Sequence, residues 1–312
     1  MRKKIVFVVG PGRSGTTVFS KFLGMHSRCF ALSEPHYFDA QIRADDYCSC
    51  EKKYSQCSFW QLVITRLKEK GVQIEEFVTS GVPFYASNGL IEKIFKNLTL
   101  IIYYRFGLSY ASRGFFEQIE REAILLETVA ESVQEEYIID ASKGFVRALF
   151  LQRYLRGKFD FHYIILSRDP RSNVYSKMKT SSNIAFSDGT KVVMDEQGAS
   201  LEEALRQWNK ITRKYILFDR IFGTRAIKVV YELFTQDPKN FFVKKVSDPL
   251  GLSWEEKMTD LTSKEHHLMG GNFSRINAKS IHPAKEEWRK LPQGQIDLIS
   301  TKTRKTFSYF SA

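Results

Sequence analysis

The segment from residue 5 to residue 17 reads Ile5-Val6-Phe7-Val8-Val9-Gly10-Pro11-Gly12-Arg13-Ser14-Gly15-Thr16-Thr17. Its five consecutive apolar residues predict a buried strand. Apolar residues at helical spacing over 16–25 predict a helix directly after the glycine-rich turn. In a strand–turn–helix unit of this kind, the glycines let the backbone curl around an oxyanion, and the first N–H groups of the helix point at it. The segment therefore predicts a phosphate-binding loop.

The loop departs from the Walker motif of nucleotide kinases, G-x-x-x-x-G-K-[ST]. Gly10 and Gly15 have the correct spacing, but Thr16 stands where the lysine should be, and the basic residue is Arg13 inside the loop. An NTPase also needs an acidic residue that helps to hold magnesium. Asp140 is the nearest candidate for that acid. A P-loop kinase or NTPase is therefore one alternative for the function.

Four further apolar runs, at 29–32, 137–140, 162–167 and 226–231, predict buried parallel strands. Helical patterns at 145–154, 170–179 and 201–221 alternate with them. This alternation predicts an α/β fold with three layers, in which helices cover both faces of a central parallel sheet. We expect residues 1–312 to form a single domain, since this length suits one large α/β unit.

Residues 58–135 interrupt the strand–helix rhythm and predict a helical insertion. Apolar residues favour helices near 62–67, 90–95 and 115–133. Aromatic residues gather in the same interval: Tyr103, Tyr104, Phe106, Tyr110, Phe115 and Phe116. We interpret most of them as packing groups, with a place in the lining of an acceptor cleft as the alternative for some. No window of about 18 apolar residues occurs in the chain, so we expect no membrane span.

The net charge of +12, from 47 basic and 35 acidic residues, favours anionic partners. A nucleic-acid-binding protein would explain this charge and is a second alternative. Such a protein is expected to carry a basic stripe with stacking aromatic residues, and no recognised motif of that kind occurs. We therefore expect no nucleic-acid partner.

Four later segments share the polar chemistry of the loop. They are Ser167-Arg168-Asp169-Pro170-Arg171-Ser172-Asn173-Val174-Tyr175-Ser176, Asp140-Ala141-Ser142-Lys143, Val230-Tyr231-Glu232-Leu233, and Gly271-Asn272-Phe273-Ser274-Arg275 with Trp288-Arg289 beyond it. Arg168 is predicted at the carboxyl end of a parallel strand, where ligands bind in open α/β sheets. Ser176 lies eight residues later, two turns into the next predicted helix. A guanidinium and a hydroxyl in this arrangement can converge on one anion.

With the loop, these segments make five ordered matches across residues 5–290 that resemble the sulfotransferases dependent on 3′-phosphoadenosine-5′-phosphosulfate (PAPS). The resemblance is greatest to the carbohydrate, tyrosylprotein and bacterial branches, in which arginine occupies the loop position that cytosolic enzymes give to lysine. It implies a P-loop-like fold, PAPS as co-substrate, and transfer of a sulfuryl group to a hydroxyl or amine. A metal is not obviously required for this chemistry, because the donor already carries a good leaving group.

The resemblance also implies a role for each matching residue. The 5′-phosphosulfate would be held by Gly12, Arg13, Ser14, Gly15, Thr16 and Thr17, and the 3′-phosphate by Arg168 and Ser176. The nucleotide site would be shaped by Tyr231, Asn272, Ser274 and Arg275, within a C-terminal lid over residues 272–281. Lys143 and Arg13 would stabilise charge on the transferring group. One departure is Glu287 before Trp288, where the tyrosylprotein branch has lysine.

The general base has two candidates. Glu34 lies 21 residues after Arg13 and matches the glutamate base of the tyrosylprotein and carbohydrate branches. His36 lies two residues further on, and its intrinsic pKa suits a base better. On an extended segment both side chains face the same side. We favour Glu34, chiefly from the resemblance.

The acceptor is open among carbohydrates, lipids, steroids, tyrosine and amines, and the sequence does not predict the oligomeric state. The basic N-terminus precedes an apolar run that is too short for a signal peptide, and Gly10-Pro11-Gly12 follows it in place of a cleavage site. We therefore expect a cytoplasmic enzyme, with a lumenal domain as the alternative.

Cys48, Cys50 and Cys57 lie between the proposed base and the predicted insertion. Their C-x-C-x6-C spacing fits no standard zinc pattern. Free thiols or one local disulfide are the favoured state, and zinc held with Cys29 or a histidine is the less favoured one. In either bound form, we expect the cysteines to clip the loop beside the acceptor cleft and to take no part in catalysis.

Overall fold

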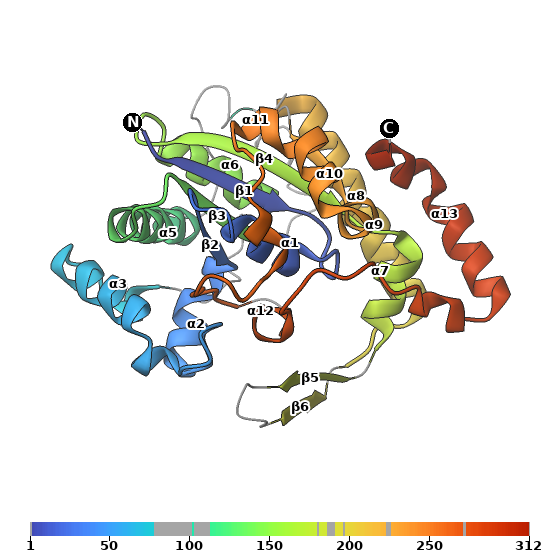
Figure 1. Cartoon of the computed structure of the whole chain (residues 1–312), viewed down its shortest axis with the longest axis horizontal. Helices are drawn as coiled ribbons and strands as arrows, with labels where there is room; N and C mark the ends of the chain where they lie inside the picture. Colours follow the sequence, from blue (N-terminus) through green and yellow to red (C-terminus); the bar gives the residue numbers. More distant parts are fainter. Residues whose placement is uncertain are drawn as a thin grey trace.

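The computed structural model describes residues 2–77, 102, 113–179, 181–185, 191–195, 197–222, 226–270 and 273–311. Its centre is a sheet of five parallel strands in the order β2-β3-β1-β4-β7 (Figure 1). The strands are β1 (Lys4–Val9), β2 (Cys29–Ser33), β3 (Tyr137–Lys143), β4 (Asp160–Ser167) and β7 (Ile227–Val230). All five strand predictions and the α/β, parallel-sheet class are confirmed.

Alternate residues of β1 enter two separate apolar cores, because successive side chains of a strand point to opposite faces. Val6 and Val8 face α1 (Thr16–Gly24), α9 (Tyr231–Gln236) and α10 (Pro238–Phe242). Ile5, Phe7 and Val9 face the other layer, which contains α3 (Ser58–Glu69), α5 (Arg113–Ser132), α6 (Phe145–Tyr154) and α8 (Leu201–Phe222). Helices therefore cover both faces of the sheet, as the continuous apolar strands predict.

A third, smaller core joins α7 (Pro170–Met178), α8 and the C-terminal helix α13 (Gln293–Ser311) through Val174, Trp208 and Ile299. The antiparallel pair β5 (Ser181–Ala185) and β6 (Lys191–Asp195) forms a separate two-stranded sheet. The remaining short elements are η1 (Pro35–Tyr37), α2 (Phe38–Arg43), η2 (Tyr54–Gln56), η3 (Ile74–Glu76), η4 (Val243–Ser247), α11 (Asp248–Leu250), η5 (Glu256–Thr259), α12 (Ser274–Asn277) and η6 (Glu287–Lys290).

Between β2 and β3, α3 and α5 coincide with two of the helices expected there. The third, near 90–95, lies outside the described residues, as do Tyr103, Tyr104, Phe106 and Tyr110. Phe115 and Phe116 lie on α5, and both contact Phe150 of α6. These two aromatic residues are therefore packing groups. The limits of the insertion and the single-domain organisation stay predictions.

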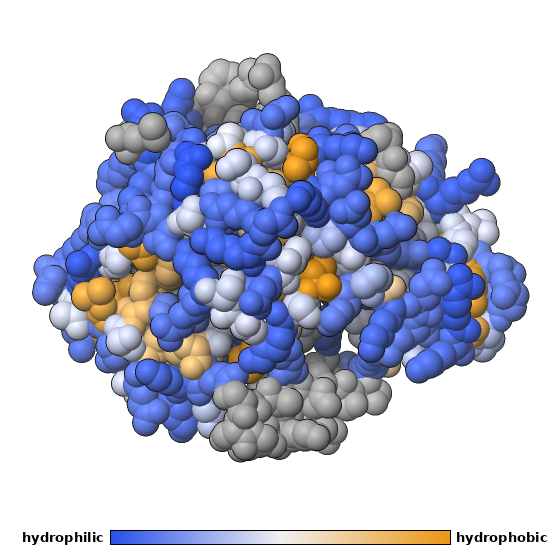
Figure 2. Space-filling view, in the orientation of Figure 1, coloured by the Kyte–Doolittle hydropathy of each residue, from blue (hydrophilic) through white to orange (hydrophobic). Residues whose placement is uncertain are grey.

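Within the described residues, no helix has both the length and the apolar character that a membrane crossing requires. Figure 2 shows a largely hydrophilic face with hydrophobic residues in small separate groups, the broadest of them over the region where Figure 1 places α2 and α3.

We predict that Phe22→Ala lowers the free energy of unfolding by about 3–5 kcal/mol, since it leaves a cavity in a close-packed aromatic group. Phe22 is fully buried on α1. Its ring centroid lies 4.9 Å from that of Phe234 and 6.0 Å from that of Phe242. Urea denaturation measures the loss. The control is Leu62→Ala on α3, where the side chain is 41% exposed. Equal losses for the two variants would contradict the assignment of Phe22 to the core.

Candidate functional site

The predicted phosphate loop lies between β1 and α1, at the carboxyl edge of the sheet. Gly15 has a φ of +90° directly before α1, a backbone conformation that disfavours any residue with a Cβ. Gly10 lies so close to β4 that an added Cβ would be 2.2 Å from the carbonyl oxygen of Leu166. The loop therefore requires glycine at position 15 for its conformation and at position 10 for its close approach to β4, as the motif predicts. Ser14, Thr16 and Thr17 are buried at the start of the helix, and Gly12 and Arg13 are half-buried.

Asn173 of α7 holds the loop in place from the neighbouring element. Its side-chain amide Nδ2 donates to the carbonyl oxygen of Gly12 at 2.8 Å and to Oγ of Ser14 at 3.2 Å. Asn173 is fully buried, and Asp169 caps the helix that carries it by accepting from the N–H of Arg171. A well-capped helix thus fixes the amide, and the amide fixes the loop.

Arg168 extends from the end of β4 toward the same loop. Its Nη1 donates to the carbonyl oxygen of Arg13 at 3.3 Å, and its Nε lies 3.7 Å from Oε1 of Glu232. The guanidinium lies 5.2 Å from the ring centroid of Tyr231. The same ring packs on Gly15, where an added Cβ would be 2.3 Å from it. Tyr231, which directly follows β7, therefore contacts both the loop at Gly15 and the guanidinium of Arg168.

Lys143 and Glu34 meet in an ion pair between the ends of β3 and β2, with Nζ donating to Oε1. Glu34 is almost completely buried, whereas the Lys143 side chain is partly exposed. Tyr215 of α8 connects this pair to the phosphate loop. Its hydroxyl lies 2.5 Å from the carbonyl oxygen of Lys143 and 3.1 Å from that of Gly10. The proposed base and the loop are therefore parts of one polar cluster.

His36, the rival base, lies in the same cluster, with Nε2 4.0 Å from Oε2 of Glu34. Burial, followed by the charge of Arg147, lowers its pKa to about 3, although Asp140 opposes the shift. An imidazole with so low a pKa is neutral at pH 7 and is a weak proton acceptor. This environment favours Glu34 over His36 as the base.

Three non-glycine residues in the left-handed region of φ lie at the carboxyl ends of adjacent strands or in the loop that follows one. They are Arg13 after β1, Ser33 in β2 and Lys143 in β3, with φ values of 66°, 63° and 62°. Such conformations are unfavourable and gather at functional sites. Buried hydroxyls without a hydrogen-bond partner in the described part of the chain occur at the same edge: Ser33, Ser142 and Ser167. Backbone strain and unsatisfied polar groups both make this edge the candidate ligand site.

Asp140, the candidate magnesium ligand of the NTPase alternative, is occupied by the protein. Its Oδ2 accepts from Arg147 at 2.7 Å, and its Oδ1 accepts from the N–H of Ser142 at 2.9 Å. Glu122 of α5 forms the second ion pair of Arg147. Burial alone would lower the pKa of Arg147, but the two carboxylates outweigh it and raise the pKa. These three residues thus form a buried ion-pair network that links α5, β3 and α6, and the engagement of Asp140 in it weakens the NTPase alternative.

The predicted C-terminal lid lies against α1. Lys21 donates to the carbonyl oxygens of Arg275 and Ala278 at 3.2 and 2.8 Å. Burial, with a smaller contribution from Lys279, lowers the pKa of Lys21 to about 8. Arg275 is buried, and its Nη2 donates to Asp46 and to the carbonyl oxygen of Tyr47. These contacts join the lid to the segment after α2, so a nucleotide contact by Arg275 stays a prediction. Ser274 begins α12, and Asn272 lies outside the described residues.

Ser176 is half-buried on α7, and among the described residues it makes no hydrogen bond to Arg168. Trp288 approaches the same helix from the C-terminal segment, with the guanidinium of Arg171 3.8 Å from its ring centroid. Glu287, where the resemblance departs from the tyrosylprotein pattern, pairs with Lys179 at 2.6 Å. The C-terminal segment therefore contacts α7, although not through the residue type expected.

Two residues that organise the site were not identified from the sequence. Asn173 lies inside the quoted Arg168–Ser176 segment, but nothing in the pattern distinguishes it from a solvent-exposed helix residue. Tyr215 lies on a long amphipathic helix, where an aromatic residue is ordinarily a packing group. Both act through tertiary contacts with the loop, and no sequence motif encodes those contacts.

Comparison with protein-family models and with curated proteins finds no match. Among solved structures, the sulfotransferase domain from the Synechococcus PCC 7002 olefin synthase is similar, with a TM-score of 0.51 and 17% identity over 96% of this chain and 95% of that one. The sulfotransferase domain from the curacin biosynthetic pathway has a TM-score of 0.51 and 14% identity, over 97% of this chain and 99% of that one. This chain therefore has the fold of these sulfotransferase domains.

Proposed function

We propose that this protein is a PAPS-dependent sulfotransferase that transfers a sulfuryl group to a hydroxyl or amine of an acceptor. One observation carries the proposal: the loop at residues 10–17, Arg168 and the Lys143–Glu34 pair converge at a single edge of the sheet. The names of the two similar structures support sulfuryl transfer as the chemistry. The resemblance to the carbohydrate, tyrosylprotein and bacterial branches stays a prediction.

The loop supplies the features that a phosphosulfate requires. Gly15 directly precedes α1, and the buried Thr16 and Thr17 begin it, so the first N–H groups of the helix and its dipole favour an anion there. Arg13 lies within the loop and adds a positive charge. In this proposal Gly12 and Ser14 contribute backbone groups, and Asn173 keeps their geometry fixed.

Arg168 is suited to hold the 3′-phosphate of the donor. Its present contacts, at 3.3 Å to a carbonyl oxygen and 3.7 Å to Glu232, are long, so the guanidinium can turn to a phosphate at small energetic cost. Tyr231 lies beside it and offers an aromatic surface next to the loop. We place Ser176, Ser274 and Asn272 at the nucleotide on the resemblance alone.

Glu34 is the proposed base. When bound, the donor supplies a sulfuryl group on a good phosphate leaving group. Glu34 takes the proton of the acceptor hydroxyl while the oxygen of that hydroxyl forms the new bond to sulfur. At the same time, the bond between sulfur and the phosphate oxygen breaks. The leaving oxygen keeps that electron pair. Lys143 and Arg13 place positive charge beside the oxygens on which negative charge develops, and this electrostatic contribution is commonly the largest single one in such reactions.

Lys143 therefore has two partners in the proposed cycle. Its ion pair with Glu34 keeps both side chains in position before the donor binds. A sulfuryl group beside Lys143 competes for the ammonium, which loosens the ion pair and leaves the carboxylate freer to accept a proton. The buried setting of Glu34 limits its access to water and leaves the acceptor hydroxyl as its proton source.

The kinase or NTPase alternative is tested by comparing ATP and PAPS binding with and without magnesium. The nucleic-acid alternative is tested by a salt-sensitive gel shift with random oligonucleotides.

An acceptor screen with radiolabelled PAPS would identify the acceptor, for which a hydroxyl-bearing carbohydrate, lipid or other small molecule is our prediction. A cytoplasmic location also stays a prediction.

We predict that the protein binds adenosine 3′,5′-bisphosphate much more tightly than AMP, because only the bisphosphate offers Arg168 a 3′-phosphate to bind. Arg168→Ala should weaken bisphosphate binding by about 1.5–3 kcal/mol, or roughly 10- to 150-fold, and should leave AMP binding nearly unchanged. Isothermal titration calorimetry measures both ligands. The matched control is Arg113→Ala on α5, where the side chain is 91% exposed. Equal affinities of the wild-type protein for bisphosphate and AMP would disprove the donor assignment.

We predict that Glu34→Gln retains bisphosphate binding and loses turnover by about 10²- to 10⁴-fold, because the amide cannot accept the proton. His36→Ala should reduce turnover less, since the buried imidazole is a weak base. Single-turnover assays with radiolabelled PAPS measure the rates, and bisphosphate binding together with the melting temperature controls for folding. A folded, nucleotide-binding His36→Ala variant with the larger loss would show that the histidine is the base.

A further inference from the structure

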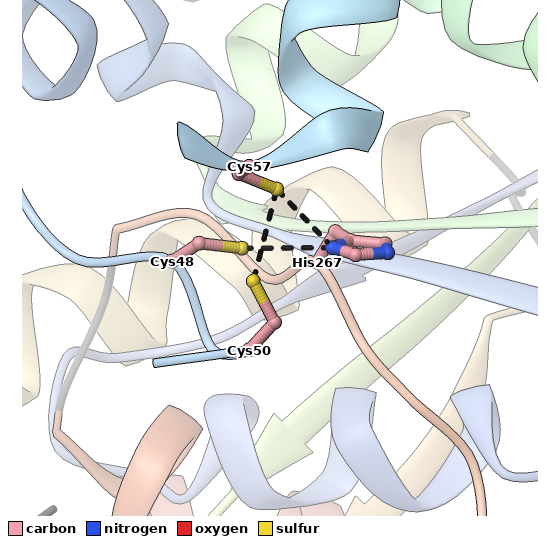
Figure 3. A group of neighbouring side chains, drawn as sticks. All are labelled: Cys48, Cys50, Cys57 and His267. Carbon is pink, nitrogen blue, oxygen red and sulfur yellow. Dashed lines mark hydrogen bonds between the residues drawn. The ribbon is translucent and has the colours of Figure 1, made fainter. Parts of the chain in front are cut away.

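Three cysteines and a histidine come together beside the candidate site (Figure 3). Cys48, Cys50 and Cys57 belong to the segment between α2 and α3, and His267 belongs to the segment between η5 and α12. The three sulfur atoms and one ring nitrogen of His267 all lie within 4.8 Å of one another. Figure 3 shows the four side chains pointing toward a common centre from different directions.

Three of the six distances between these atoms are close to the edges of a tetrahedral metal site, and all six are within 4.8 Å. Zinc bonds of about 2.3 Å to sulfur and 2.0–2.1 Å to nitrogen give edges of about 3.8 Å between two sulfurs and about 3.6 Å between sulfur and nitrogen. The Sγ atoms of Cys50 and Cys57 are 3.7 Å apart. Nδ1 of His267 is 3.8 Å from Sγ of Cys48 and 3.3 Å from Sγ of Cys57. A Cys₃His donor set is one that structural zinc prefers.

The histidine ring is held so that Nδ1 faces the sulfur atoms. Phe59 stacks on it, with ring centroids 4.9 Å apart and an interplanar angle of 13°. Nε1 of Trp60 donates to the carbonyl oxygen of His267 at 3.0 Å. Ser49, between two of the cysteines, donates through Oγ to the carbonyl oxygen of His266 and accepts from the N–H of Leu268. Surrounding contacts of this kind orient ligands in known metal sites.

A disulfide explains the cluster less well. The sulfur atoms of Cys50 and Cys57 are 3.7 Å apart, whereas a disulfide bond is about 2.05 Å long. One disulfide would also use only two of the three thiols and would leave the third cysteine and His267 directed at the same centre for no reason. All four cysteines of the chain are free thiols in the structure. The sequence favoured free thiols or a disulfide over zinc because His267, more than 200 residues away, is not visible as a partner of the cysteines.

We propose that Cys48, Cys50, Cys57 and His267 form a structural zinc site. Four protein ligands fill a tetrahedral shell and leave no open position for a substrate, which is the pattern of structural and not of catalytic zinc. Cys48 and Cys57 are fully buried, while Cys50 and His267 are partly exposed, so an ion can enter from the side of the latter two. This proposal reverses the preference for free thiols or a disulfide over zinc, and it leaves the prediction that sulfuryl transfer requires no metal as it stands.

The site fastens the segment that supports Glu34. Two residues beyond His267, the N–H of Met269 donates to Leu32, and the carbonyl oxygen of Met269 accepts from the N–H of Glu34, both at 2.9 Å. Gly270 has a φ of +60° and approaches Glu34 so closely that an added Cβ would be 3.3 Å from its Cβ. Zinc would thus hold residues 267–270 against the end of β2. Only this positioning role depends on the proposed function, because metal binding itself does not.

The test is elemental analysis of the full chain, purified under reducing conditions without chelator. We expect about one zinc ion per chain, with at least tenfold less in Cys57→Ser and His267→Gln. Cys29→Ala is the matched control and should keep its zinc, since Cys29 is a buried core residue of β2 outside the cluster. Protein without zinc that also takes up none from added zinc chloride would overturn the proposal, as would equal zinc in the His267→Gln variant.

A second measurement covers the case in which the variants fail to fold. Wild-type protein expressed with cobalt should show the visible d–d bands of a tetrahedral ion and a thiolate charge-transfer band in the near ultraviolet. Octahedral cobalt spectra, or a mass two hydrogens lower with one disulfide and no metal, would refute the site. Zinc content and cobalt spectra do not involve PAPS, so a failure here is distinguishable from a failure of the proposed function.

Discussion

The position of β1 in the middle of the parallel sheet is the constraint on which the rest of the structure depends. β1 pairs with β3 on one side and with β4 on the other, and its side chains are buried on both faces. Because all neighbours run in the same direction, their carboxyl ends meet at one edge. The chain leaves β1 there through a tight glycine-containing loop. Glu34, Lys143 and Arg168 leave their own strands at the same edge, so sheet geometry alone brings residues more than 100 positions apart to one site.

This edge is conformationally strained, and tertiary contacts compensate for the strain. The register of β3 shifts against both neighbours near its end, close to the left-handed residues Ser33 and Lys143. Each such residue destabilises the fold by roughly 1–3 kcal/mol unless its surroundings fix it. Here the surroundings include Tyr215, which contacts the carbonyl oxygens of two strand ends, and Asn173, which binds the loop. Several elements therefore hold the cluster at once.

The titratable side chains at the site differ in burial and in the charged groups around them. These two factors decide whether each side chain is charged and whether it can bind an anion. Arg147 is buried but has two carboxylate partners, Glu122 and Asp140, so it stays charged and links α5, β3 and α6. His36 is held neutral because burial and the charge of Arg147 lower its pKa, although the carboxylates of Glu34 and Asp140 lie nearby. Lys143 and Arg168 are partly exposed. Lys143 has one ion pair, with Glu34, and Arg168 has a long one of 3.7 Å with Glu232, so both side chains can turn to a bound anion. The zinc site that we propose would fasten residues 267–270, which form backbone hydrogen bonds with the end of β2 and with Glu34.

The sequence by itself determined the strands, the α/β class and the position of the glycine-containing loop between β1 and α1, because apolar runs and glycine spacing are local properties of the chain. It also identified Glu34, Lys143 and Arg168 as residues at strand ends. Tertiary structure decided which residues complete the site. Tyr215, Asn173 and His267 have ordinary local surroundings in the sequence and acquire their roles only by contact with distant segments. The choice between Glu34 and His36 likewise depends on burial and on the charge of Arg147, which exist only once β2, β3 and α6 have packed together.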